Sequence, residues 1–332
     1  MGKPLIAFVT GGYSGEAEIS YKSAITIQNN IDLEKFDYYT IDIRNDGWWC
    51  RVGEEEIAVD KNDFSVLANG SKLTFDAVLV GIHGTPGEDG KLQGYFDMIG
   101  LPYTSCDVTS SALTFNKRYT VAVAGMAGIK VAHSLHFFKN DPIDVAAIAA
   151  QLQFPVFVKP GNGGSSIGMS KLPDASLLGE AIGKAFAEDE QVLIEELVEG
   201  REFTIGVARL NGEVTTLPMT EVISENYFFD FEAKYKGKSR EITPAVLEEE
   251  KAEKIRTAAK KLYHIFHCNG VVRIDFIFNE KENEPYMLEI NTVPGQSEAS
   301  IVPQQVKAMG MSLKDFYSGL IEDCLGKKQM AF

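Results

Sequence analysis

Residues 271–291 read VVRIDFIFNEKENEPYMLEIN, and this stretch decides the fold of the chain around it. Its two apolar runs predict long strands, Val271–Phe278 and Pro285–Ile290. Apolar neighbours such as Phe276 and Leu288 indicate that both strands contribute to a hydrophobic core. The polar residues inside these strands are therefore candidates for a functional site.

Side-chain alternation puts Arg273 and Asp275 on one face of the first strand, and likewise Glu289 and Asn291 on one face of the second. If the strands pair, three oxygen-bearing side chains converge with one arginine. Carboxylates and an amide oxygen suit Mg²⁺ that is also bound by substrate phosphates. The alternative is a solvated face of an antiparallel sheet, but buried carboxylates need a metal or cation as partner.

The first third of the chain alternates predicted strands and helices. This order predicts an α/β fold with a parallel sheet and helices on both faces. The expected elements are strands at Leu5–Val9, Tyr38–Ile43 and Ala77–Val80, a turn at Gly11-Gly12, and a helix from Glu16 to about Gln28.

The middle third of the chain has the pattern of short helices and strands, and the last third that of longer strands. The middle third predicts two short helices within Asp107–Gly125 that divide near Asn116-Lys117, a helix that starts at Asp141-Pro142, strands at Pro155–Lys159 and Gln191–Glu195, and a helix at Asp174–Glu188. The last third adds a strand at Glu202–Leu210 and helices at Leu247–Phe266, Pro303–Gly310 and Ser312–Cys324.

Two segments lack regular periodicity. Lys159–Gly168 reads KPGNGGSSIG, in which glycines let backbone amides surround phosphate oxygens and serines add donors. It lacks the P-loop and dinucleotide fingerprints, so a plain flexible hairpin is an equal alternative. Ser224–Thr243 is polar, aromatic and Lys-rich, and a loop this long inside a compact domain is usually functional.

Composition limits the class of protein. The length of 332 residues, with 45% hydrophobic and 24% charged residues, fits two or three packed subdomains of a globular protein. The net charge of −15 argues against nucleic acid as a partner. No apolar run approaches the ~18 residues of a membrane span, and the N-terminus lacks the pattern of a signal peptide. A cytoplasmic location without a membrane partner is expected. The four cysteines lack CxxC spacing, which favours reduced thiols over zinc or redox chemistry.

Four motifs resemble those of the D-alanine–D-alanine ligases, a family of the ATP-grasp superfamily. EINTVPG at Glu289–Gly295 resembles the family's E-x-N-x-x-P-G signature, and HGTPGEDGKLQG at His83–Gly94 resembles H-G-x-x-G-E-D-G-x-x-Q-G. GGYSGEAEIS at Gly11–Ser20 is similar to the N-terminal G-G-x-S-x-E-x-x-[IV]-S, and FEAKY at Phe231–Tyr235 to the mobile loop. The motifs follow the family order across nearly the whole chain.

The resemblance implies a three-subdomain ATP-grasp architecture. Its parts are an N-terminal αβ domain at 1–105, a central ATP-grasp subdomain at 106–197 and a C-terminal subdomain at 198–332, which carries the metal site and the mobile loop 224–243. ATP would phosphorylate the carboxylate of one D-alanine, and the amine of a second would attack the acyl phosphate. D-alanyl-D-alanine, a peptidoglycan precursor, would leave with ADP and phosphate. The resemblance also implies a homodimer and two Mg²⁺ ions, with Mn²⁺ as a substitute.

Residue roles for ATP follow from the same resemblance. Lys117 and Lys159 match the lysines on the phosphates, and Asp275, Glu289 and Asn291 match the Mg²⁺ ligands. Other ATP contacts are expected from Ser166, Glu202, Lys234 and the hinge residues Glu195, Glu196, Leu197 and Val198.

Substrate roles are implied in the same way. Glu16 matches the acid on the first D-alanine's ammonium, His83 its carboxylate-positioning residue, and Ser300 and Ile301 the positions that hold the second carboxylate. Arg273 and the Gly295 amide match the groups that stabilise the tetrahedral oxyanion. Without the resemblance, an early helical glutamate is explained by the helix dipole and a lone histidine by structural hydrogen bonding.

Loop closure is implied to bring Tyr235 through Ser165 to Glu16, which would exclude water from the acyl phosphate. Ligases that make D-alanyl-D-lactate lack this tyrosine, so Tyr235 favours amide formation. Ligases for D-serine, D-lactate or another acid–amine pair remain alternatives, to be decided at Tyr235, Ser300 and Ile301.

A nucleotide-binding module without turnover is a further alternative, and it would have lost metal ligands or Arg273, which are all present. Two departures from the family pattern stand out. Asn116 replaces an aspartate, and Asn162-Gly163 replace bulkier charged residues. The second departure predicts a more mobile Gly-rich loop and weaker nucleotide binding.

Overall fold

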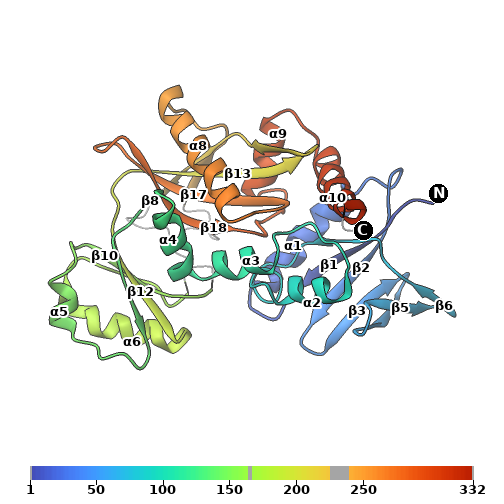
Figure 1. The fold of residues 1–332 in the computed structure, drawn as a ribbon, viewed down its shortest axis with the longest axis horizontal. Helices are drawn as coiled ribbons and strands as arrows, with labels where there is room; N and C mark the ends of the chain where they lie inside the picture. The colour runs from blue at the N-terminus through green and yellow to red at the C-terminus, as the bar shows by residue number, and fades with distance from the viewer. Residues whose placement is uncertain (1, 164–166, 225–238, 331–332) are drawn as a thin grey trace.

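Three β-sheets build the molecule (Figure 1). The computed structural model describes residues 2–163, 167–224 and 239–330. In Figure 1 a seven-stranded N-terminal sheet lies at one end, a four-stranded sheet lies at the other, and the C-terminal sheet lies between and above them.

The N-terminal sheet is only partly parallel. β1 (Leu5–Gly11) pairs in parallel with β2 (Asp37–Arg44) and β7 (Ala77–Val80). Beyond β2 the chain runs as an antiparallel meander of β3 (Gly47–Val52), β4 (Glu55–Asp60), β5 (Ser65–Ala68) and β6 (Ser71–Leu73). The expected parallel sheet is therefore wrong for these four strands. Two-residue turns at 45–46 and 53–54 explain the difference, since so short a connection joins only antiparallel strands.

Helices cover both faces of β1, as the sequence predicts. Ile6 and Phe8 pack with residues of α1 (Ala17–Gln28) and α10 (Leu313–Met330) in one buried cluster. Ala7 and Val9 point to the opposite face and pack with α2 (Lys91–Ile99). This strand is hydrophobic on both faces because both faces are covered.

The four-stranded sheet is antiparallel and has the order β11-β10-β12-β9. Its strands are β9 (Ser134–Phe138), β10 (Val156–Pro160), β11 (Ser170–Leu172) and β12 (Gln191–Glu196). α5 (Val145–Ala149), the 3₁₀ turn η1 (Ala175–Leu177) and α6 (Leu178–Glu188) accompany it. The helix expected from Asp141 is wrong. Asp144 caps α5 instead, whereas the Asp141 carboxylate accepts a hydrogen bond from the Phe138 amide at 2.7 Å and closes the preceding turn.

This small sheet is an excursion from the C-terminal sheet. β8 (Lys130–Val131) still pairs in parallel with a strand of that sheet, and the chain then leaves to form β9. Where it returns, the Glu196 amide donates to the His133 carbonyl at 2.9 Å. His133 Nδ1 also lies 3.0 Å from Glu196 Oε1. Both ends of the excursion therefore meet at one neck.

The C-terminal sheet has the order β16-β15-β13-β17-β18-β8, with β14 paired to β13. Its strands after β8 are β13 (Arg201–Leu210), β14 (Glu213–Thr216), β15 (Thr220–Ser224), β16 (Ser239–Ile242), β17 (Val271–Asn279) and β18 (Glu284–Asn291). β17 and β18 are antiparallel, with Arg273 opposite Asn291 and Asp275 opposite Glu289. The predicted strand pair is confirmed.

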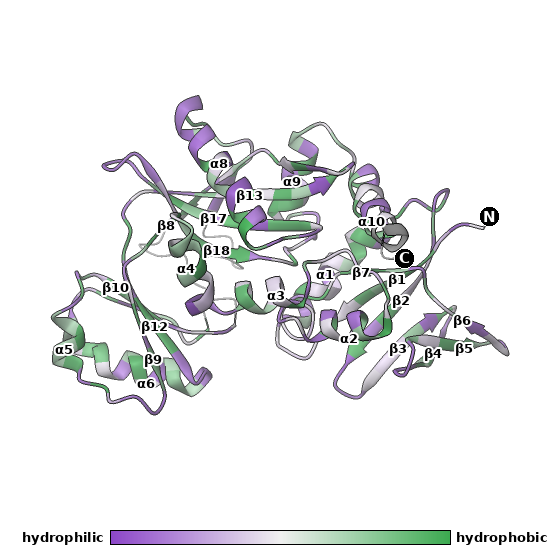
Figure 2. Cartoon of the chain, viewed as in Figure 1, coloured by the Kyte–Doolittle hydropathy of each residue, from purple (hydrophilic) through white to green (hydrophobic). Residues whose placement is uncertain are grey.

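Helices also cover the C-terminal sheet. α8 (Glu249–Ile265) and α4 (Lys117–Met126) share one buried cluster with its strands, beside α3 (Val108–Phe115). α9 (Ile301–Ala308) packs with the end of β13 in another cluster. Figure 2 shows hydrophobic residues along β13 and β17 and hydrophilic residues on the outer turns of α8. Asn116 caps α4 and so divides it from α3, where the sequence predicts a break.

Candidate active site

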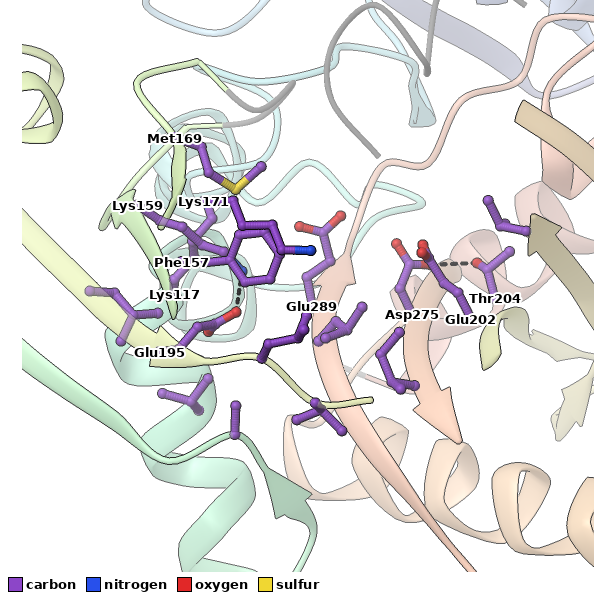
Figure 3. Close-up of a pocket in the computed structure, with 18 of the residues that line it drawn as sticks. Lys117, Phe157, Lys159, Met169, Lys171, Glu195, Glu202, Thr204, Asp275 and Glu289 are labelled. Atoms are coloured by element: carbon purple, nitrogen blue, oxygen red, sulfur yellow. Dashed lines mark hydrogen bonds and ion pairs between the residues drawn. The ribbon is translucent and has the colours of Figure 1, made fainter. Parts of the chain in front are cut away.

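A cavity of about 520 Å³ lies between the four-stranded sheet and the C-terminal sheet (Figure 3). Its wall includes the apolar side chains of Phe157, Met169 and Leu288, a surface suited to a planar base. The predicted ATP-binding residues that line it are Lys117, Lys159, Glu195, Glu196, Leu197, Val198 and Glu202.

The lysines of this cavity are held in place by neighbouring groups. Lys159 on β10 forms an ion pair with Glu195 on β12, and both side chains are largely buried. Lys171, which sequence reasoning missed, lies with its ammonium 5.6 Å from the ring centre of Phe157, and the Lys159 ammonium lies 5.2 Å from it. Alternation along β11 was the available signal for Lys171.

Lys117 ties α4 to the Gly-rich segment. Its backbone amide donates to the Gly161 carbonyl at 2.8 Å, and its ammonium donates to the Gly163 carbonyl at 2.5 Å. Burial lowers the pKa of Lys117, and the nearby Lys159 charge acts in the same direction. An anion in the cavity would therefore meet a poorly solvated ammonium.

The two departures from the family pattern contact each other. Asn116 donates through its amide to Asn162 Oδ1 at 2.9 Å, while its own oxygen accepts from the Tyr119 amide and caps α4. Asn162 donates in turn to Asp189, at 2.6 Å from its backbone and 2.9 Å from its side chain. These bonds anchor the described beginning of the Gly-rich segment.

The four polar residues of β17 and β18 do converge. Arg273 donates to both oxygens of Asp275, at 2.9 and 2.8 Å, and lies 3.7 Å from Glu289. Asn291 donates more weakly to Asp275 and Glu289, at 3.5 and 3.4 Å. Thr204 on β13 donates to Asp275 as well (Figure 3), so all the lone pairs of that carboxylate are engaged.

Opposing effects act on the Arg273 guanidinium. Burial alone would lower its pKa, but the negative charges of Asp275, Glu289 and Glu88 outweigh burial and raise the pKa above its usual value. Arg273 is therefore a permanent buried cation. Within residues 2–163, 167–224 and 239–330, no group of three or more His, Cys, Asp or Glu side chains is arranged to hold a metal.

A second cavity of about 370 Å³ adjoins the first. Both are lined by Lys117, Arg273 and Glu289, so these residues mark the junction. The predicted substrate and catalytic residues that line the second cavity are Glu16, His83, Arg273, Gly295, Ser300 and Ile301.

His83 is buried beside the second cavity. Its Nε2 lies 2.9 Å from the Ser23 hydroxyl, and its backbone amide donates to Ser20 Oγ at 2.9 Å. Burial lowers the pKa of His83 to about 4, so the ring is neutral near pH 7. The carboxylate-positioning role stays a prediction, because Nε2 of the ring already has the Ser23 hydroxyl as its partner.

Glu88 is a buried acid in the HGTPGEDGKLQG motif, and sequence reasoning indicated no role for it. Its oxygens accept from the Gly84 amide at 2.6 Å and the Val293 amide at 3.2 Å. Burial, and then the charge of Glu16, raise the pKa of Glu88 to about 7. Burial and a neighbouring negative charge both favour the neutral form of a carboxyl group and so raise its pKa.

The N-terminus of α9 closes the second cavity. Ser300 precedes the helix, and its hydroxyl lies 2.7 Å from that of Ser297. Gly295 faces it so closely that an added Cβ would lie 2.9 Å from Ser300 Oγ. Helix N-termini favour carboxylate groups, which fits the predicted place of the second substrate.

Four predicted residues, Ser165, Ser166, Lys234 and Tyr235, lie outside the described residues. The segment with Lys234 and Tyr235 is flanked by the paired strands β15 and β16. Glu241 on β16 lines both cavities.

Two family profiles match the chain: "D-ala D-ala ligase N-terminus" over residues 5–106 and "D-ala D-ala ligase C-terminus" over residues 121–322. The chain belongs to the D-alanine–D-alanine ligase family. It is 46% identical to the D-alanine–D-alanine ligase of Flavobacterium johnsoniae, with 96% of this chain and 98% of that one covered. It is 44% identical to the ligase of Parabacteroides distasonis, with 98% and 99% covered.

Solved structures agree with the family. A D-Ala:D-Ser ligase from Enterococcus faecalis superposes with a TM-score of 0.88 at 31% identity, over 97% of this chain and 99% of that one. The D-alanyl-alanine synthetase A of Vibrio cholerae gives a TM-score of 0.88 at 29% identity, over 98% and 99%. The ligase therefore has the predicted ATP-grasp fold. It is an ATP-dependent enzyme that joins D-alanine to D-alanine in peptidoglycan precursor synthesis. No helix in its described part is long and apolar enough to span a membrane.

Proposed function

We propose that the two adjoining cavities divide the reaction between them, with ATP in the larger and both D-alanine molecules in the smaller. The observation that carries this proposal is the shared lining by Lys117, Arg273 and Glu289. The γ-phosphate at this junction would face the carboxylate of the first D-alanine. Phosphoryl transfer to that carboxylate gives D-alanyl phosphate and ADP.

The second step uses the smaller cavity. Glu16 holds the ammonium of the first D-alanine, and the α9 N-terminus at Ser300 and Ile301 holds the carboxylate of the second. The second amine, as the free base, attacks the acyl carbon and forms a tetrahedral oxyanion, which then collapses with cleavage of the C–O bond to release phosphate and D-alanyl-D-alanine. Arg273 and the Gly295 amide stabilise that oxyanion, because a buried cation and a fixed N–H dipole act strongly where water is excluded.

The donor types on β17 and β18 suit magnesium, but Asp275 would first have to give up protein donors such as Arg273 and Thr204. Asp275 and Glu289 supply carboxylate oxygens and Asn291 an amide, which hard cations prefer. The Asn291 amide presents its NH₂ group to both carboxylates, so it has to turn to offer oxygen. When bound, one or two Mg²⁺ ions would neutralise phosphate charge, and Mn²⁺ would substitute for them.

Lys159 and Lys117 orient the phosphates, with Ser166 and Lys234 as further contacts. Glu195, Glu196, Leu197 and Val198 bind the adenine edge and Glu202 the ribose. Tyr235, Ser165 and Glu16 form a chain that seals the site when the loop that carries Tyr235 closes. Closure protects the acyl phosphate from water.

A ligase with D-serine as second substrate is the second candidate. It is favoured by the 31% identity and full-length similarity to a D-Ala:D-Ser ligase. Ser300 and Ile301 would distinguish the acceptors, and Tyr235 would disfavour D-lactate.

The test measures phosphate release from ATP with D-alanine alone, with and without Mg²⁺, and identifies the product by mass. Stoichiometric D-alanyl-D-alanine is the expected product. Release only after D-serine is added would transfer the assignment to the second candidate, and release only with D-lactate would contradict both candidates. Retained turnover in EDTA would remove the metal from the proposal.

We also propose that the enzyme is a cytoplasmic homodimer, as its use of ATP and its family suggest. Its subdomains would be 1–105, 106–197 and 198–332. Sedimentation velocity tests the dimer, and limited proteolysis tests the boundaries.

A further inference from the structure

Two side chains join the same pair of loops across the smaller cavity. We name residues 81–90 the His83 loop and residues 292–297 the Gly295 loop. Ser23, from α1, contacts His83 Nε2 at 2.9 Å and accepts from the Gln296 amide at 3.0 Å. Glu88 accepts from the amides of Gly84 and Val293, at 2.6 and 3.2 Å. Each bridge therefore contacts one residue of the His83 loop and one residue of the Gly295 loop.

We propose that Ser23 and Glu88 are positioning residues that fix the His83 loop against the Gly295 loop. They thereby set where the first D-alanine lies relative to the Gly295 amide. Neither residue belongs to the ligand sets described above. The inference rests on the substrate roles proposed for Glu16, His83 and Gly295.

The directions of the hydrogen bonds show how Ser23 works. A neutral imidazole has one N–H and one acceptor nitrogen. A backbone hydrogen bond with Val293 raises the pKa of the ring, against the effect of burial. In the tautomer that carries the proton on Nδ1, Nε2 accepts from the Ser23 hydroxyl, which itself accepts from the Gln296 backbone amide. In either tautomer the Ser23 hydroxyl joins the His83 ring to the Gln296 backbone.

Burial makes this arrangement specific. Ser23 is 0% exposed, and Gln296 and His83 are each 5% exposed. Water cannot replace a lost partner at such a site, so a displaced loop would leave polar groups unsatisfied. The Tyr317 hydroxyl donates to Gln296 Oε1 at 3.0 Å, which extends the bridge to α10.

The His83 loop also touches the proposed ammonium ligand. A Cβ added to Gly84 would lie 2.4 Å from Glu16 Oε2, so the loop backbone packs directly against that carboxylate. A shift of the His83 loop would therefore move Glu16 and the first substrate together. A displacement of about 1 Å at reacting groups can lower a rate roughly a hundredfold.

The experiment compares Ser23→Ala and Glu88→Gln with Ser318→Ala in the full-length enzyme. Ser318 is 3% exposed, and its hydroxyl has no hydrogen-bond partner among the described residues, so it controls for loss of a buried hydroxyl. We expect kcat/KM for D-alanine to fall at least about tenfold in the first two variants. KM for ATP should change less than twofold, and Ser318→Ala should resemble wild type.

A spectroscopic signal separates positioning from stability. In ¹⁵N-imidazole-labelled enzyme, with His83 assigned through His83→Gln, the Nε2 resonance should shift in Ser23→Ala because that nitrogen loses its hydrogen-bond partner. Folded variants with unchanged kcat/KM for D-alanine would overturn the proposal, whatever their melting temperature. If Ser23→Ala does not fold, Glu88→Gln tests the proposal instead. Its side-chain oxygen still accepts from one of the two loops, so this variant breaks the bridge but loses only one of the two hydrogen bonds.

Failure of the proposed function would look different. A wild-type enzyme that forms no D-alanyl-D-alanine would overturn the substrate roles. The Nε2 resonance would still report the Ser23 contact, and its insensitivity to Ser23→Ala would overturn the bridge itself.

Discussion

The two cavities are held together by different interactions. In the nucleotide cavity the pairs are charged: Lys159 with Glu195, and Arg273 with Asp275. In the amino-acid cavity they are hydrogen bonds of the buried Ser23, His83 and Glu88 to neighbouring groups. Ion pairs can exchange a partner for phosphate or metal, whereas these hydrogen bonds join protein groups to one another. We therefore expect ligands to rearrange the first cavity more than the second.

Arg273 belongs to both cavities, so its loss should have the largest effect. Arg273→Met should lower turnover by about a thousandfold, the scale for loss of an oxyanion-stabilising group. It also leaves Asp275 buried without its cation, which should lower the free energy of unfolding by about 3 kcal/mol. Phosphate release and urea unfolding measure the two effects.

Arg44→Met is the matched control for this prediction. Arg44 pairs with both oxygens of Glu56, at 3.2 and 2.9 Å, on the N-terminal sheet and outside both cavities. Its turnover should stay near wild type. A similar loss in both variants would mean that Arg273 acts through the fold alone.

Glu289→Gln tests the charged side of the comparison. It removes one proposed metal-binding charge but keeps the shape, so turnover should fall at least about a hundredfold with unchanged circular dichroism. Glu284→Gln, at the other end of β18, serves as control. Near-normal phosphate release by Glu289→Gln would remove this residue from the metal site.

Lys159→Met should separate the cavities. The loss of a charge-assisted hydrogen bond to phosphate should raise KM for ATP roughly tenfold. KM for D-alanine should stay within twofold. Lys139→Met, an exposed change outside both cavities, should alter neither value. Equal increases in both KM values would contradict independent cavities.

The buried acid and histidine beside the amino-acid cavity should make the stability of the enzyme depend on pH. The pKa of Glu88 is raised from 4.5 to about 7, so its folded form holds a proton that the unfolded chain releases, and stability falls as pH rises through this window. The pKa of His83 is lowered from 6.5 to about 4, so the unfolded chain binds the extra proton and stability rises with pH there. The two trends oppose each other between about pH 4.5 and 6.5.

Single variants should expose each trend. Relative to wild type, Glu88→Gln should add a positive slope of about 1.4 kcal/mol per pH unit to the unfolding free energy, and His83→Gln a negative one. Urea unfolding between pH 4.5 and 6.5 measures both. Parallel curves for the two variants would show that these groups titrate normally in the folded enzyme.

Strand alternation alone predicted the charged residues of the nucleotide cavity, whereas the lining of the amino-acid cavity was predicted only through the family resemblance, and the Ser23 bridge not at all. Alternation alone put Arg273 with Asp275 and Glu289 with Asn291, because strand periodicity is local and their apolar neighbours fixed the strands. Ser23 gave no such signal. Its partners, His83 and Gln296, lie 60 and 273 residues away, and a serine in a helix has no preferred role.

The misplaced elements have local causes. The antiparallel β3–β6 meander was missed because its strands are short and partly polar, and the signal lay in two-residue turns. Asp144 rather than Asp141 caps α5, because both residues are able to cap and the Asp141 carboxylate already accepts from the Phe138 amide. Competition between nearby aspartates is decided by the fold.

The neck at His133 and Glu196 brings the two ends of residues 133–196 together. Both ends of this piece lie at one place, and segments with adjacent ends tolerate excision, permutation and transplantation. The ligase could thus be divided there into two polypeptides that regain the nucleotide cavity only on reassembly. Fused to two other proteins, the halves would report the association of those proteins through ATP-dependent ligation.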